Sequence, residues 1–276
     1  MDSLGVCAVS LPVESLVSDP VGVVAGLVEK IKQQKNCDVF LFPEYMWAAL
    51  AHGIGDEQKG FTETSRYLWG KVIPELMAQL PSTGLYILGT GPYHDGQALF
   101  NRCPIIMDRE LVEQDKIFLT PWETQFQGGK SPKVYTYRGV RFAVLVCLDI
   151  EIPDLAVYLK KQDIEMVFVP SATEGLNGWQ RISRCASARS VELGAGVAVA
   201  HLRGGLPETV DLVSENVGST GFFLPSQSFF EEPRQVIGKP EAMGLHWDYY
   251  AFPIEAIRAA KKSDETNPAA LGSWPS

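Results

Sequence analysis

The chain has 276 residues, of which 46% are hydrophobic and 21% are charged. A globular fold of this length buries about 75% of the surface of the unfolded chain, so one large domain is expected. The 24 basic and 33 acidic residues give a net charge of −9, which argues against nucleic acid or an anionic membrane as a partner. Apolar runs are only strand-sized, so neither a membrane span nor a signal peptide is expected. Five cysteines without a C-x-x-C pair favour a reducing cytoplasm over a disulfide framework.

The first half of the chain alternates strand and helix patterns. It opens with a predicted strand over residues 4–9 and an amphipathic helix, for which Asp19 can supply the cap and Pro20 the first turn. The pattern then predicts, in order, a strand over 38–42, a helix over 62–79 that kinks near Pro74, strands over 85–90 and 98–107, and a β segment from 110 to 118.

The second half mixes hairpins with further helices. Arg138-Gly139 joins two alternating segments into a predicted hairpin over 134–146, whose second strand ends at Cys147. The remaining predicted elements are a helix after Pro153, a strand over 166–169, a helix over 178–193, strands over 197–201, 221–224, 235–238 and 245–252, and a helix over 254–261. We therefore expect a single domain over 1–262, folded as a layered α/β or α+β sandwich, and a tail over 263–276.

Motifs for metal, nucleotide and serine chemistry are missing from the sequence. The 4 histidines lie far apart and form neither an H-E-x-x-H motif nor a cluster with cysteines. No glycine-rich phosphate loop occurs, and Gly218-Ser219-Thr220-Gly221 has the wrong spacing for a nucleophile elbow. We expect no metal and no cofactor.

Three residues at the ends or edges of strands could carry chemistry. Cys147 closes an apolar strand, where α/β sheets place reactive groups, although a buried free cysteine often serves only as a small hydrophobe. Glu44 also ends an apolar strand and is desolvated there unless it caps a helix or faces solvent. Lys116 lies in a segment that alternates polar and apolar residues, and this pattern could simply direct its side chain to solvent. Together the three residues would supply a nucleophile, a base and a cation that holds an oxyanion.

Three motifs in a fixed order make the comparison more specific. The first is Phe42-Pro43-Glu44-Tyr45, the second runs from Lys116 to Glu123, and the third is Val144-Leu145-Val146-Cys147-Leu148-Asp149. With these motifs, and with flanking segments such as Phe100-Asn101, the chain resembles the nitrilase superfamily of carbon-nitrogen hydrolases over about residues 4–250. The resemblance implies a four-layer αββα sandwich, usually paired as a homodimer.

The resemblance also implies roles for the site residues. Cys147 would be the nucleophile that forms a thioester, and Glu44 the general base. Lys116 Nζ and the backbone N–H of Leu148 would stabilise the oxyanion. Glu123 would orient Lys116 or the substrate, unless it only forms a structural ion pair. The expected activity is hydrolysis of a small linear amide in the cytoplasm.

Departures from the family pattern leave the substrate open. Leu148 stands where many members carry an aromatic residue, Leu193 where Asn is usual, and His201 where a small polar residue is typical. A nitrilase, an N-carbamoyl amine hydrolase, an enzyme that passes the acyl group to an amine, and a catalytically silent scaffold are the alternatives to an amidase.

The residues expected to bind substrate indicate its charge. The expected pocket residues are Tyr45, Trp122, Glu151 and Thr173, with Trp179 as a further aromatic candidate. Relatives that act on carboxylates often carry an Arg four residues after the nucleophile, where this chain has Glu151. We therefore expect a neutral or amine-bearing amide, with Glu151 excluding acids, unless Glu151 faces solvent or pairs with a basic residue such as Arg189.

Overall fold

A computed structural model of the chain describes residues 2–18, 20–51, 57–206, 213–230, 235–238, 244–265 and 267–269. The predicted cap residue Asp19 and residues 266 and 270–276 of the predicted tail lie outside the described residues.

Two sheets form the centre of the fold. The first contains β1 (Leu4–Pro12), β2 (Val39–Leu41), β3 (Leu85–Ile87), β4 (Gly91–His94), β5 (Leu99–Met107), β6 (Glu110–Asp115) and β13 (His246–Phe252). The second contains β7 (Val134–Tyr137), β8 (Val140–Val144), β9 (Met166–Ser171), β10 (Gly196–Arg203), β11 (Gly221–Phe223) and β12 (Gln235–Ile237). The sheets are continuous through a short parallel pairing of β1 with β10.

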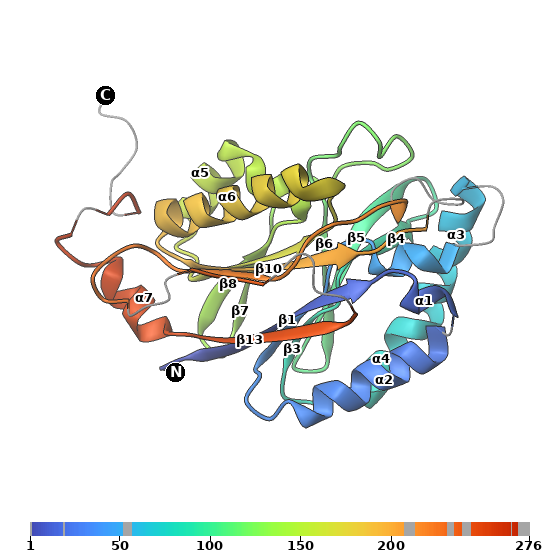
Figure 1. Cartoon of the computed structure of the whole chain (residues 1–276), viewed down its shortest axis with the longest axis horizontal. Coiled ribbons are helices and arrows are strands. Elements are labelled where there is room, and N and C mark those ends of the chain that lie inside the picture. Colours follow the sequence, from blue (N-terminus) through green and yellow to red (C-terminus); the bar gives the residue numbers. More distant parts are fainter. Residues whose placement is uncertain are drawn as a thin grey trace.

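Helices cover the outer face of each sheet, which makes four layers (Figure 1). The helices beside the first sheet are α2 (Pro20–Gln33), α3 (Glu57–Tyr67) and α4 (Ile73–Gln79), and those above the second are α5 (Pro153–Lys160) and α6 (Gly175–Leu193). Shorter helices are α1 (Ser15–Ser18), η1 (Met46–Ala51), η2 (Leu68–Val72), η3 (Cys147–Glu151) and α7 (Ile254–Ala260). The predicted αββα sandwich is confirmed.

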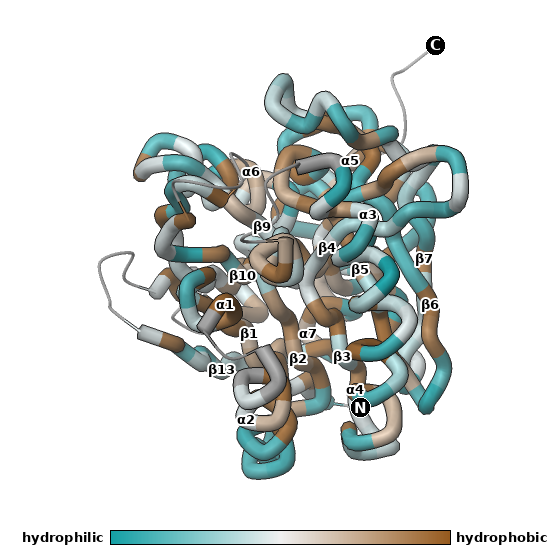
Figure 2. Tube along the Cα trace, turned by 90° about the vertical axis from the view of Figure 1, so that its right-hand side faces the viewer, coloured by the Kyte–Doolittle hydropathy of each residue, from teal (hydrophilic) through white to brown (hydrophobic). Residues whose placement is uncertain are grey.

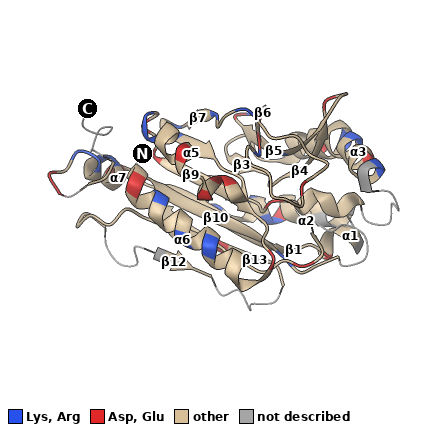
Figure 3. Cartoon of the chain, turned by 90° about the horizontal axis from the view of Figure 1, so that it is seen from above, with Lys and Arg blue, Asp and Glu red and all other residues tan. Residues whose placement is uncertain are grey.

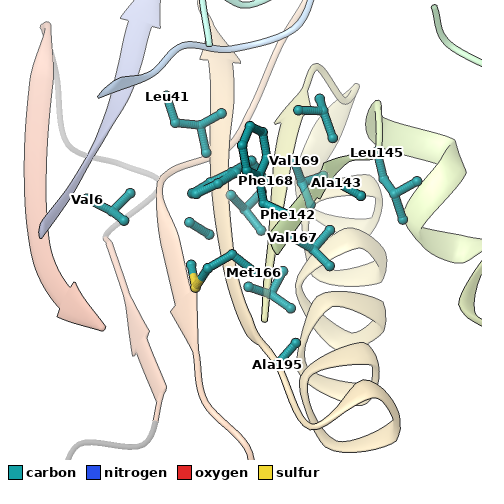
Figure 4. Packing of buried hydrophobic residues seen from close by; sticks show 14 of the residues in the cluster. Val6, Leu41, Phe142, Ala143, Leu145, Met166, Val167, Phe168, Val169 and Ala195 are labelled. Carbon is teal, nitrogen blue, oxygen red and sulfur yellow. The ribbon is translucent and has the colours of Figure 1, made fainter. Parts of the chain in front are cut away.

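Strand β1 shows how the layers are held together. Its residues are buried on both faces, and alternate side chains enter different cores. Val6 and Ala8 belong to the core between the sheets, whereas Cys7 and Val9 pack under the helices. Figure 4 shows Val6 directed toward the strand that carries Phe168. Along the trace in Figure 2, hydrophobic residues follow the central strands and hydrophilic residues gather on the outer turns.

The predicted helix over 62–79 differs from the observed structure. It begins earlier, at Glu57, and a wide π turn over Leu68–Val72 separates α3 from α4. Pro74 lies in the first turn of α4, where its missing N–H removes a hydrogen bond to the preceding turn. The proline therefore widens the helix one turn before itself, which is where the predicted kink occurs.

Two predicted strands end earlier than expected. Strand β3 ends at Ile87 because Gly89 adopts a φ of +66° and turns the chain. A side chain at Gly89 would also collide with the carbonyl oxygen of Pro43. Strand β6 ends at Asp115, which leaves Lys116 outside the sheet.

Charges on the surface are mixed in sign. On the face seen in Figure 3, Lys and Arg positions alternate with Asp and Glu positions, and α6 carries several of the basic ones. Within the described part of the chain, no helix combines the length and the apolar character needed to span a membrane.

Candidate active site

Cys147 lies at a sharp bend between β8 and η3. The strand ends at Val144, three residues before Cys147, although the backbone N–H of Leu145 still bonds the carbonyl of Phe168 at 3.0 Å. Cys147 adopts a φ of +48°, a costly conformation for a residue with a side chain. Its Sγ lies 3.4 Å from the carbonyl oxygen of Ala172, so the bend aims the thiol at the end of β9.

Glu44 and Lys116 meet beside this thiol. Both side chains are 1% exposed, and Lys116 Nζ lies 2.8 Å from Glu44 Oε1. The alternative from the sequence, in which Glu44 or Lys116 faces solvent, is therefore wrong. Stacking of the two sheets brings together the nucleophile, carboxylate and cation that the three motifs predicted.

Glu123 holds Lys116 from the other side. Its Oε2 lies 2.8 Å from Lys116 Nζ and accepts the backbone N–H of Thr120 at 2.7 Å. Its Oε1 accepts a hydrogen bond from the Tyr45 hydroxyl. The ammonium group therefore lies between two buried carboxylates, and the sequence prediction that Glu123 contacts Lys116 agrees with this arrangement.

Two partners of Glu44 were not assigned a role from the sequence. Asn101 Nδ2 donates to Glu44 Oε1 at 2.9 Å, and the backbone N–H of Ala172 donates to Glu44 Oε2 at 3.0 Å. Asn101 is fully buried, and its carbonyl accepts the backbone N–H of Lys116 at 2.9 Å. The Phe100-Asn101 pair before the second motif could have indicated a site role for Asn101, because it is part of the family resemblance.

Asp149 joins the loop of Lys116 to the loop of Cys147. Its carboxylate accepts the backbone N–H groups of Ile117 at 3.2 Å, Phe118 at 2.8 Å and Val146 at 3.2 Å. Burial raises the pKa of Asp149 to about 7, although these N–H groups act in the opposite direction. The same bonds explain the early end of β6, because backbone groups that would extend the sheet are held by Asp149 instead. The Cys-x-Asp pattern of the third motif could have indicated this role of Asp149 from the sequence.

The pKa values of Glu44 and Glu123 shift in opposite directions. Burial raises the pKa of Glu44 despite the nearby Lys116 ammonium, and the charge of Glu123 raises it further. Burial also acts upward on Glu123, but Lys116 and the hydrogen bonds from Tyr45 and Thr120 together outweigh it and hold the pKa of Glu123 below its usual range. The carboxylates around Lys116 raise its pKa against the effect of burial, so the amine stays protonated. Burial raises the pKa of Cys147 to about 12, so the resting group is a thiol.

A cavity of about 650 Å³ opens above these groups. The predicted residues Tyr45, Trp122, Leu148, Glu151 and Thr173 all line it, whereas the predicted Trp179 is not part of its lining. Trp122 is 71% exposed and lies at the rim. The hydroxyl groups of Tyr45 and Thr173 are already bonded, to Glu123 and to the Val217 carbonyl. Their contact with a substrate would therefore be through the ring and the methyl group.

Glu151 has a different partner from the one predicted. Its carboxylate is paired with Arg181, at 2.5 Å between Oε2 and Nε, and only its backbone carbonyl is bonded by Arg189, at 3.2 Å. Glu151 Oε1 is buried and has no hydrogen-bond partner among the described residues. Arg181 also lines the cavity, and the sequence prediction did not include it.

The site offers no metal ligands of the usual kind. Across the described residues, no three His, Cys, Asp or Glu side chains are grouped so that they could hold a metal ion. The buried groups instead resemble the set needed for acyl transfer: a nucleophile, a base and a fixed cation.

Comparisons with known proteins identify the family of the chain. The model of the carbon-nitrogen hydrolase family matches residues 8–225. The probable hydrolase YhcX of Bacillus subtilis (strain 168) is 30% identical over 126 residues, which is 45% of this chain. The match spans only about a quarter (24%) of the length of that curated relative.

Solved structures show the same fold at low sequence identity. XC1258 of Xanthomonas campestris, a CN-hydrolase superfamily protein with an arsenic adduct in its active site, gives a TM-score of 0.73 at 13% identity, covering 100% of this chain and 99% of that chain. An amidase from Nesterenkonia sp. AN1, solved as a mutant in complex with butyramide, gives 0.63 at 16%, covering 94% of each chain. Because the family model matches most of the chain, the chain belongs to the carbon-nitrogen hydrolase family.

Proposed function

We propose that this hydrolase cleaves small linear amides through a thioester on Cys147. The observation that carries the proposal is the buried contact of Glu44 with Lys116 at 2.8 Å, beside the Cys147 thiol at the floor of the cavity. The butyramide complex of the similar amidase supports an amide as substrate. Ammonia release from a panel of small amides, nitriles and carbamoyl compounds tests the proposal. An amide that is hydrolysed faster than its matched nitrile and carbamoyl compound is the expected result.

In the first half of the reaction, Glu44 removes the thiol proton as Sγ attacks the carbonyl carbon. A base is needed because the pKa of the Cys147 thiol, raised to about 12, leaves very little thiolate at neutral pH. The negative charge that develops on the carbonyl oxygen would be held by Lys116 Nζ and the backbone N–H of Leu148. When the C–N bond breaks, Glu44 returns the proton to the leaving ammonia or amine.

In the second half, Glu44 takes a proton from water and the hydroxide attacks the thioester carbonyl. The C–S bond breaks, the acid leaves, and Cys147 regains its proton from Glu44. Glu123 keeps Lys116 charged and in place in both halves, because it is ionised and bonded to Nζ. The raised pKa of Glu44 suits a group that must both accept and return a proton.

Replacing Lys116 with methionine is expected to lower kcat by about 10²–10³, because one oxyanion donor is lost. It also leaves Glu44 and Glu123 without the cation between them, so a lower melting temperature is expected. The matched control is Lys133→Met, which removes an ion pair with Glu113 at a half-exposed site. Steady-state kinetics and thermal unfolding measure both effects. A near-normal kcat in Lys116→Met would contradict the oxyanion role.

The substrate of this proposal is neutral or carries an amine. The cavity is lined by three carboxylates (Glu44, Glu151 and Glu174) and two cations (Lys116 and Arg181). Because Glu151 lines the cavity and its Oε1 has no partner in the described structure, its carboxylate can accept a hydrogen bond from a substrate amine.

Matched amides ending in an ammonium, a methyl or a carboxylate group test this assignment. We expect the highest kcat/KM for the ammonium compound and about a tenfold or greater loss of that preference in Glu151→Gln. Arg181→Gln is the control, since it keeps the acceptor and removes the guanidinium that pairs with it. A preference for the carboxylate that is lost in Arg181→Gln would show that Arg181 selects the substrate.

Pairing of two copies through the outer faces of α5 and α6 is part of the proposal. Val157 is 57% exposed and Tyr158 40% exposed on α5, and Leu176 is 51% exposed on α6. These apolar side chains on neighbouring helices suit a two-fold interface.

A further inference from the structure

A row of polar side chains crosses the carboxyl ends of β8, β9 and β10. In the parallel pairing of β9 with β10, Ser171 is the partner of His201. Continuing the pairing of β8 with β9 beyond Val144 and Phe168 brings Cys147 to the level of Ser171. The 3.4 Å contact of Cys147 Sγ with the Ala172 carbonyl agrees with this placement. Partners on adjacent strands direct their side chains to the same face, about 4.8 Å apart.

Ser171 is a buried polar group that the mechanism above does not use. The residue is fully buried, and its hydroxyl oxygen has no hydrogen-bond partner in the described part of the structure. Buried polar groups are nearly always bonded, so an exception beside a nucleophile calls for a functional explanation. The Ser171 hydroxyl acts to lower the pKa of the Cys147 thiol, although burial outweighs it.

His201 determines which way the Ser171 proton can point. His201 is fully buried, and its Nδ1 lies 2.7 Å from the Ser219 carbonyl, which can only accept a hydrogen bond. Burial lowers the pKa of His201 to about 4, so the neutral ring carries its hydrogen on Nδ1. Nε2 is then an acceptor and has no partner among the described residues. His201 therefore donates nothing to Ser171, and the hydroxyl proton of Ser171 is available to Cys147 Sγ.

We propose that Ser171 is a positioning residue for the nucleophile, whose hydroxyl turns toward Cys147 Sγ when Glu44 removes the thiol proton. The charged groups that also face the thiol are Glu44 and Lys116. The inference rests on the proposed function in one respect, namely that Cys147 is the nucleophile.

The test is the rate at which acrylamide alkylates Cys147 across a range of pH. Ser171→Ala removes one oxygen atom from a buried site and should change the fold little. We expect alkylation at neutral pH to slow about tenfold, with the apparent pKa of the thiol shifted upward by about one unit. Peptide mass spectrometry reads the modification at Cys147 separately from the other cysteines.

Ser10→Ala is the matched control. Ser10 is equally buried on β1, which pairs with β10, and its hydroxyl donates to the His201 backbone carbonyl at 3.1 Å, not to the thiol. We expect its alkylation rate and pH profile to equal those of the wild type. Equal profiles for wild type and Ser171→Ala, or equal slowing in both alanine variants, would overturn the inference. A wild-type Cys147 that resists acrylamide at every pH would overturn the proposed function as well.

Discussion

Replacing Cys147 with alanine is expected to abolish amide hydrolysis, with a loss on the order of 10⁶ in kcat, as when a covalent nucleophile is removed from a hydrolase. The physical reason is that the thioester cannot form, while Glu44 and Lys116 remain in contact at 2.8 Å without it. Ammonia release measures the rate. Intact mass spectrometry of the wild type, quenched during turnover of an activated ester, should show the mass of one added acyl group.

Cys185→Ala is the control for this substitution. Cys185 is also a free cysteine, half-buried on α6, and it is not among the residues that line the cavity. Its variant should keep both the wild-type rate and the acyl adduct. An acyl adduct that persists in Cys147→Ala, or hydrolysis at more than a thousandth of the wild-type rate, would show that another group attacks the substrate.

The second large effect is expected for Glu44→Gln, which keeps the size of the side chain but removes the base. We expect kcat to fall by about 10²–10⁴, the usual contribution of a positioned acid or base. The wild-type rate should rise with pH as Glu44 ionises, because the carboxylate is the active form. Burial raises the pKa of Glu44 above its ordinary 4.5, so this rise should occur at higher pH than for an exposed glutamate. The variant should lack this limb of the profile.

Glu165→Gln provides the comparison for Glu44→Gln. Glu165 is also buried and pairs with Arg258, but its carboxylate bonds the backbone N–H of Arg141 at the opposite end of β9. We expect this variant to unfold at a lower temperature and to keep a near-normal kcat and pH profile. If Glu44→Gln affected only stability in the same way, Glu44 would be a structural residue.

The sequence by itself determined the class of fold and supplied the candidates for the reactive groups. The first and third motifs couple the end of an apolar strand to a residue with distinctive chemistry, and the second begins at a lysine, so Glu44, Lys116 and Cys147 could be picked out as candidates without coordinates. The hairpin turn at Arg138-Gly139 could also be predicted from adjacent residues alone, and both residues adopt a positive φ in the structure. Such patterns depend only on residues that are neighbours in the chain. The strands, helices and turns predicted from them differ from the structure mainly at their ends.

Only the tertiary structure decided how these groups are charged and held. Ala172, whose N–H bonds Glu44, lies 128 residues away in the sequence, and Asn101 lies 57 residues away. Glu151 pairs with Arg181 instead of Arg189, and Lys116 leaves its strand because Asp149 holds the following backbone. The physical reason is that burial and pairing arise where two sheets stack. The pKa of a carboxylate depends on that environment, which strand and helix periodicity do not encode.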